Sequence, residues 1–132
     1  MSESESTLSE FKSKSGLRRI LRAMSYSLAG LRTAWRNEHA FRQELMVIAP
    51  AAVVALLLPL PALHKLALIG VLILVLIVEL INSAIEAAID RISLERHPLS
   101  KNAKDFGSAA VALVLLLAAS TWAVILYPLL AG

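Results

Sequence analysis

Residues 66–90 read LALIGVLILVLIVELINSAIEAAID, and the fold class follows from this stretch. Its first half, Leu66–Val78, contains no charged residue, whereas the second half begins at Glu79 and carries three acidic residues. A long uncharged run is typical of a transmembrane helix, and acidic residues at a helical spacing after it indicate that the helix continues to the membrane surface. We therefore predict a membrane span over 63–91, longer than the roughly 20 residues needed to cross a bilayer.

Two further apolar stretches flank this one. The first predicted span covers 45–60, and the third covers 101–127, within a charge-free run from Phe106 to Gly132. Ser100 is the expected cap at the start of the third span. The chain is 58% hydrophobic, above the roughly 45–50% of a soluble domain, and it has no cysteine for a disulfide or a thiolate metal site. The sequence thus predicts an all-α membrane protein with three transmembrane helices.

The N-terminal region differs in composition from the spans. Residues 1–15 are rich in Ser, Glu and Lys, so we expect a disordered leader there. Residues 16–36 place apolar side chains at steps of three and four, with arginines on the opposite face. This pattern favours an amphipathic surface helix in the membrane interface. A helix packed on a partner protein is the alternative.

The positive charges predict the orientation of the spans. Of 13 Lys and Arg residues, eight precede residue 45 and four lie in 91–104. Because loops rich in Lys and Arg stay in the cytoplasm, the N-terminus and the 91–104 connection are expected there. With three crossings, the C-terminus is expected on the other side.

Polar side chains recur along the end of the second span, as Glu79, Asn82, Ser83, Glu86 and Asp90. Their spacing of three, four, seven and eleven from the first places them on one face of a helix. Acidic residues in a membrane helix normally face a bundle interior or a polar cavity and serve a function. Carboxylates suit Mg²⁺ bound together with nucleotide phosphates, and a deeper carboxylate can accept a proton from an alcohol.

Other interpretations of these charges remain open. The acidic residues are alternatively solvated charges at a helix end, with Lys104 as a partner for Asp90 or Glu86 and Asp105 as a helix-start charge. A non-catalytic membrane subunit or an ion relay is the rival function. No G-x-x-x-x-G-K-[ST] loop is present among the five glycines, so the phosphate-binding loops of soluble kinases are excluded.

Three blocks of the sequence resemble the prokaryotic diacylglycerol kinase family. They are Glu79–Arg91 (ELINSAIEAAIDR), Ala103–Val111 (AKDFGSAAV) and Ala34–Glu44 (AWRNEHAFRQE), in the order and at the separations of that family. The resemblance implies that residues 16–132 form a membrane domain that assembles as a homotrimer. It also implies ATP-dependent phosphorylation of diacylglycerol to phosphatidic acid at the cytoplasmic face of the bacterial inner membrane, with the C-terminus periplasmic. Undecaprenol or another lipid alcohol is the alternative substrate.

The same resemblance implies roles for individual residues. Glu79 would be the general base, with Asn82 beside it as a polar active-site residue. Mg²⁺ would be held by Glu38 and Glu86, which also belong to the ATP site. The other expected ATP contacts are Arg19, Tyr26, Glu95, Arg96, His97, Lys104 and Asp105. The expected lipid-site residues are Arg19, Trp35, Gln43, Glu44, Glu79, Ser108 and Trp122.

Overall fold

The computed structural model describes residues 2–132, and that part of the chain forms four helices: α1 (Glu3–Asn37), α2 (His39–Leu57), α3 (Ala62–Ile92) and α4 (Pro98–Ala131). The helices α2, α3 and α4 are each long and apolar enough to cross a membrane, which confirms the three predicted spans. The chain divides into two compact units, one ending at Asn37 and one beginning at Glu38. Each unit is described by itself.

Helix α1 begins earlier than the predicted surface helix. The Ser2 backbone N–H donates to Glu5 Oε2 at 3.0 Å, as in a capping box. Glu3 and Glu5 lie in the first turn, where negative charge interacts favourably with the helix dipole. The described residues of the segment 1–15 are therefore helical from Glu3 onward, where a disordered leader was predicted, and Met1 lies outside the described residues.

Helix α2 is flanked by an extended residue at each end, and residues 58–61 separate it from α3. Glu38 has φ −108° and ψ 107°, and its side chain makes no cap hydrogen bond to α2. Leu58 is extended at the other end, with φ −70° and ψ 147°. Because a residue before proline disfavours the α conformation, Pro59 ends the helix at Leu57, slightly before the predicted limit of the span.

Helix α4 starts at Pro98 and is capped by His97. The imidazole Nδ1 of His97 accepts a hydrogen bond from the Leu99 backbone N–H at 3.1 Å. Proline at the first helical position has no N–H to satisfy and has its φ preset for a helix. The prediction that Ser100 caps this helix was therefore wrong, because Ser100 already lies in the first turn.

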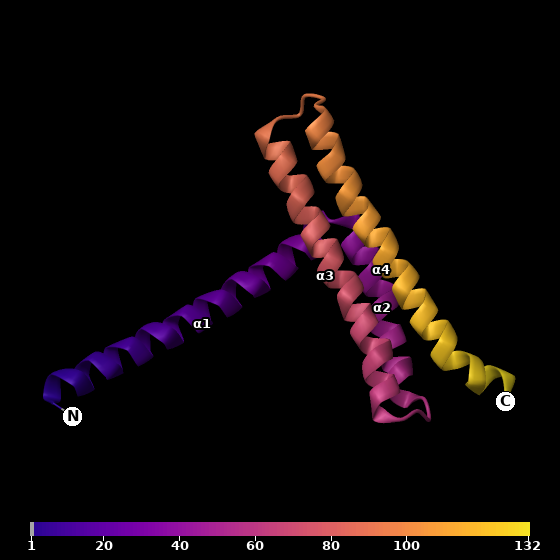
Figure 1. The fold of residues 1–132 in the computed structure, drawn as a ribbon, viewed down its shortest axis with the longest axis horizontal. Coiled ribbons are helices and arrows are strands. Elements are labelled where there is room, and N and C mark those ends of the chain that lie inside the picture. Colours follow the sequence, from indigo (N-terminus) through magenta and orange to yellow (C-terminus); the bar gives the residue numbers. More distant parts are fainter. Residues whose placement is uncertain (1) are drawn as a thin grey trace. The chain divides into compact units, whose positions relative to one another are not determined.

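In the second unit α3 contacts both α2 and α4 (Figure 1). Buried residues repeat at every seventh position on each helix, a spacing typical of left-handed helix packing. These positions are Phe41, Ile48 and Ala55 on α2, Leu68 and Val75 on α3, and Gly107 and Val114 on α4. Four residues beyond Val75, the same stripe of α3 reaches Glu79, so an acidic side chain occupies a core position.

The α2–α3 turn and the α3–α4 loop lie at opposite ends of this bundle (Figure 1). At the α2–α3 turn the Lys65 ammonium donates a hydrogen bond to the Leu56 carbonyl oxygen at 2.7 Å. The last carbonyls of a helix lack partners within the helix and carry partial negative charge. Lys65 therefore caps α2 from the first turn of α3.

We expect Lys65→Met to destabilise the bundle by about 1–2 kcal/mol, because the variant keeps the aliphatic stem and loses the charged hydrogen bond. Unfolding in detergent micelles, followed by circular dichroism, measures this loss. Lys101→Met is the matched control, since Lys101 pairs with Asp105 on one exposed helix face. An equal or larger loss in the control would contradict the capping role of Lys65.

Candidate functional site

Glu79 is the deepest polar residue of the site, with only 5% of its surface exposed. Its carboxyl group lies within hydrogen-bonding reach of the Glu44 carboxyl group on α2. Glu44 Oε2 is buried without a hydrogen-bond donor among the described residues. Two carboxylates can only accept hydrogen bonds, so this contact becomes a hydrogen bond when one proton lies between them. The spacing of residues along the sequence could not predict this pair, because Glu44 lies on α2 and Glu79 lies on α3.

Asn82 and Glu86 follow Glu79 on the same face of α3, as the sequence predicted. Asn82 Nδ2 lies 3.4 Å from Glu86 Oε1, while Asn82 Oδ1 is buried and has no partner among the described residues. Glu79 also interacts electrostatically with Glu86 and with Glu38. Glutamates from the start of α2 and the second half of α3 thus gather around one buried carboxyl group.

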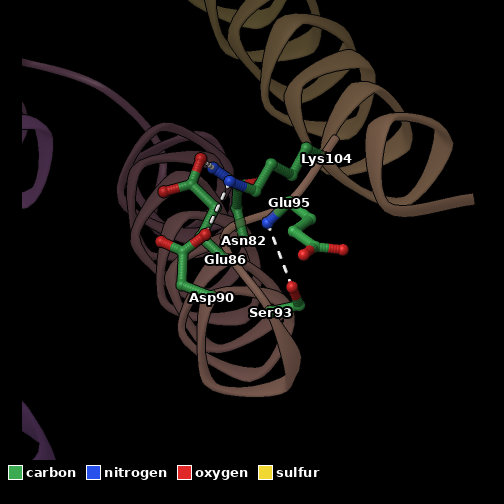
Figure 2. A network of polar contacts seen from close by, with 6 residues as sticks. All are labelled: Asn82, Glu86, Asp90, Ser93, Glu95 and Lys104. Atoms are coloured by element: carbon green, nitrogen blue, oxygen red, sulfur yellow. Dashed lines mark hydrogen bonds and ion pairs between the residues drawn. The ribbon is translucent and has the colours of Figure 1, made fainter. Parts of the chain in front are cut away.

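Lys104 connects α4 to α3 near the α3–α4 loop. Its Nζ lies 2.7 Å from Asp90 Oδ1, with the two side chains 43% and 49% exposed. Figure 2 shows Lys104 reaching from α4 toward the face of α3 that carries Asn82, Glu86 and Asp90. The pairing with Asp90 that the sequence left open is therefore formed, and the ammonium lies beside the polar face of α3.

A pocket of about 690 Å³ lies where α3, the following loop and the start of α4 meet. Its volume is within the range of small-molecule sites. Glu95, Arg96, His97, Lys104 and Asp105 all line it, so the structure brings together the predicted ATP residues of this region. Asp90, a member of the polar face predicted on α3, also lines the pocket, together with three polar residues that the sequence had not assigned to a binding site: Ser93, Ser100 and Lys101.

The pocket is shaped by local hydrogen bonds of the loop. Ser93 Oγ accepts from the Glu95 backbone N–H at 3.0 Å, which fixes the turn after α3 (Figure 2). Lys101 Nζ lies 2.5 Å from Asp105 Oδ2 along the first turns of α4. Asp105 therefore already has a partner four residues away on its own helix. The alternative interpretation of Asp105 as a helix-start charge was wrong, because the first turn of α4 contains no acidic residue.

The donor set fits a magnesium ion that is completed by phosphates. Among the residues that the structure describes, no three His, Cys, Asp or Glu side chains form a ready-made metal cage. Mg²⁺ usually takes one or two protein carboxylates and fills its remaining positions with water and substrate phosphates. Glu38 and Glu86 each interact electrostatically with Glu79, and they are the two carboxylates that would hold such an ion.

Several predicted residues are not among those that form this cluster. Arg19, Tyr26 and Trp35 lie on α1, which belongs to the other unit. Gln43 and Ser108 are exposed on α2 and α4. These positions neither support nor contradict their predicted contacts.

Trp122 contacts the half of α3 that precedes Glu79. Its indole N–H donates to the Leu68 carbonyl oxygen at 3.1 Å. Leu68 precedes Glu79 by eleven residues, which is about 16 Å along a helix. Trp122 therefore links α4 to α3 away from the polar cluster.

Comparison with known proteins agrees with this arrangement. Residues 25–126 match the prokaryotic diacylglycerol kinase family. A diacylglycerol kinase of Pseudomonas aeruginosa is 54% identical over 118 residues, covering 89% of this chain and 96% of the relative. The diacylglycerol kinase of Escherichia coli K12 is 49% identical over 112 residues, covering 85% and 92%. A diacylglycerol kinase of Haemophilus influenzae is 38% identical, covering 85% and 95%. With three apolar helices, a buried glutamate and a match over most of its length, the chain belongs to the prokaryotic diacylglycerol kinase family of membrane enzymes.

Proposed function

We propose that this protein transfers the γ-phosphoryl group of ATP to the primary hydroxyl of diacylglycerol, giving phosphatidic acid at the cytoplasmic face of the membrane. The observation that carries this proposal is the buried Glu79 carboxyl group in the same bundle as a loop pocket lined by Lys104. An apolar helix bundle admits a lipid from the membrane, while the loop pocket, with Arg96, Lys101 and Lys104 in its lining, is suited to a nucleotide. The two substrates thus approach one line of polar residues on α3.

In the proposed reaction Glu79 accepts the proton of the lipid hydroxyl as its oxygen attacks the γ-phosphorus. The bond between the γ-phosphorus and the β,γ-bridging oxygen breaks, and ADP leaves. Lys104 supplies positive charge to the phosphates, and Asn82 orients the reacting groups from its place between Glu79 and Glu86. Mg²⁺ held by Glu38 and Glu86 would neutralise phosphate charge. The residues Glu95, Arg96, His97 and Asp105 would surround the nucleoside end of the pocket.

The decisive experiment is phosphorylation in mixed micelles. Purified protein with Mg²⁺ and γ-labelled ATP is expected to label diacylglycerol, and chelation of Mg²⁺ is expected to stop the reaction. Undecaprenol in parallel micelles tests the alternative lipid substrate. Absence of any labelled lipid, with ATP consumed or not, would contradict the proposal.

We also propose that Glu44 positions Glu79 through the proton that their carboxyl groups share. Glu44→Gln keeps a donor in place and should retain activity within about threefold. Glu44→Leu leaves Glu79 without this donor, and an unsatisfied buried group costs about 1–3 kcal/mol, or roughly 5–150-fold in rate. Initial rates of the two variants test this order. Equal losses in both would contradict a hydrogen-bonding role.

The assembly and orientation are part of the same proposal. Three copies of the chain would pack through the exposed apolar faces of their spans, with the N-terminus and the 91–104 loop in the cytoplasm and the C-terminus in the periplasm. On α1 the side chains of Leu17, Ile20 and Met24 are more than half exposed, which supports a helix lying in the membrane interface. Chemical cross-linking in native membranes tests the trimer, and labelling of single introduced cysteines tests the orientation.

A further inference from the structure

A glycine of α4 lies directly against the proposed active-site amide of α3. Gly107 is buried, and a Cβ atom built on it would collide with Asn82 Oδ1. The same Cβ would lie 3.2 Å from Asn82 Cγ and 3.8 Å from Asn82 Cβ. The three atoms nearest to this missing methyl group thus all belong to Asn82. The space that Gly107 leaves open is occupied by the carboxamide of one side chain.

The Asn82 carboxamide has few other constraints. Its nitrogen lies 3.4 Å from Glu86 Oε1, and its buried oxygen has no hydrogen-bond partner among the described residues. A side chain with one long hydrogen bond is held mainly by the shape of its surroundings. Because the oxygen and nitrogen of an amide are nearly equal in size, this steric argument holds for either orientation of the group.

We infer that Gly107 is a positioning residue, which by lacking a side chain lets the Asn82 carboxamide lie against α4 and turn toward Glu86. This role rests on the proposed function for its kinetic consequence, because Asn82 would orient the reacting groups. A methyl group at position 107 would push the amide away while leaving the backbone of both helices in place, since the colliding atom is the end of a side chain. Displacement of about 1 Å at a reacting centre can cost about 100-fold in rate.

The competing explanation is helix packing alone. Small residues let membrane helices approach closely, and Gly107 lies on the same stripe of α4 as Val114 and Ala118. A packing role predicts that a larger residue weakens the bundle whatever side chain occupies position 82. A positioning role predicts that the effect depends on Asn82.

The test is a double-mutant cycle with Gly107→Ala and Asn82→Ala. We expect Gly107→Ala to lower kcat at least about tenfold, with a small change in KM for ATP and an unchanged unfolding midpoint. In the Asn82→Ala background, which removes the colliding atoms, the same change should alter the residual kcat less than twofold. Additive losses in the two backgrounds would overturn the inference and support packing.

Gly70→Ala is the matched control, because it makes the same change in membrane helix α3 with no atom within 4 Å of the new Cβ. We expect wild-type kcat for this variant; a loss equal to that of Gly107→Ala would overturn the inference.

A second measurement does not depend on turnover. The side-chain amide resonance of Asn82, assigned in ¹⁵N-labelled protein by its absence in Asn82→Ala, should shift in Gly107→Ala and stay in place in Gly70→Ala. An unshifted resonance in Gly107→Ala would overturn the inference even if the kinetics change. A shifted resonance in a protein that phosphorylates no lipid would instead retain the contact and refute the proposed function.

Discussion

Glu79→Gln is expected to lower lipid phosphorylation by about 10²–10⁴-fold, the usual contribution of a general base. Glutamine has nearly the same size and shape as glutamate, so the packing of the buried α3 stripe should be retained. It cannot accept the hydroxyl proton, and the lipid oxygen would then attack without a base. Steady-state rates in mixed micelles measure the loss, and gel filtration with circular dichroism confirms that the variant is folded and assembled.

Glu10→Gln provides the matched control for this prediction. Glu10 is exposed on α1, so neutralising its carboxylate removes the same charge without touching the buried cluster. We expect this control to have wild-type activity. Near-normal phosphatidic acid formation by Glu79→Gln would remove Glu79 from the reaction and leave the proposed mechanism without its base.

Lys104→Met is expected to lower kcat/KM for ATP by about 10²–10³-fold, as is typical when one charge-stabilising donor is lost from an active site. In the structure the ammonium of Lys104 is bound to Asp90 at 2.7 Å and lines the loop pocket. Both side chains are about half exposed, so this ion pair is weak enough to be shared with, or exchanged for, a phosphate group. Initial rates over a range of ATP concentrations measure the change.

Two further variants distinguish the effect of the Lys104 charge from the effect of its ion pair with Asp90. Lys104→Arg keeps the positive charge and should recover part of the activity, since arginine also binds phosphate. Asp90→Asn removes the partner but keeps the lysine, and its effect on KM for ATP should be less than tenfold. A larger loss in Asp90→Asn than in Lys104→Met would show that the ion pair itself, and not the lysine charge, is what the site requires.

The sequence was sufficient for those features that depend on local pattern. Charge-free runs predicted the three helices that are long and apolar enough to cross a membrane, because hydrocarbon admits few charged residues. The helical period placed Glu79, Asn82 and Glu86 on one face of α3, along which Glu79 is buried, Asn82 is half-buried and Glu86 is exposed. The helix ends were less accurate: Pro59 ends α2 early, and His97 caps α4 in place of Ser100. Such boundaries depend on which of several neighbouring residues stops or caps the helix.

The amino-acid sequence by itself thus determined the number of apolar helices, the face of α3 that carries the acids, and the family. Tertiary packing alone decided that Glu44 meets Glu79, that Lys104 binds Asp90, and that Gly107 makes room for Asn82. The physical reason is that periodicity describes one helix at a time. Contacts between helices depend on their relative rotation and register, which are set by the packing of core residues such as Ile48, Val75 and Val114.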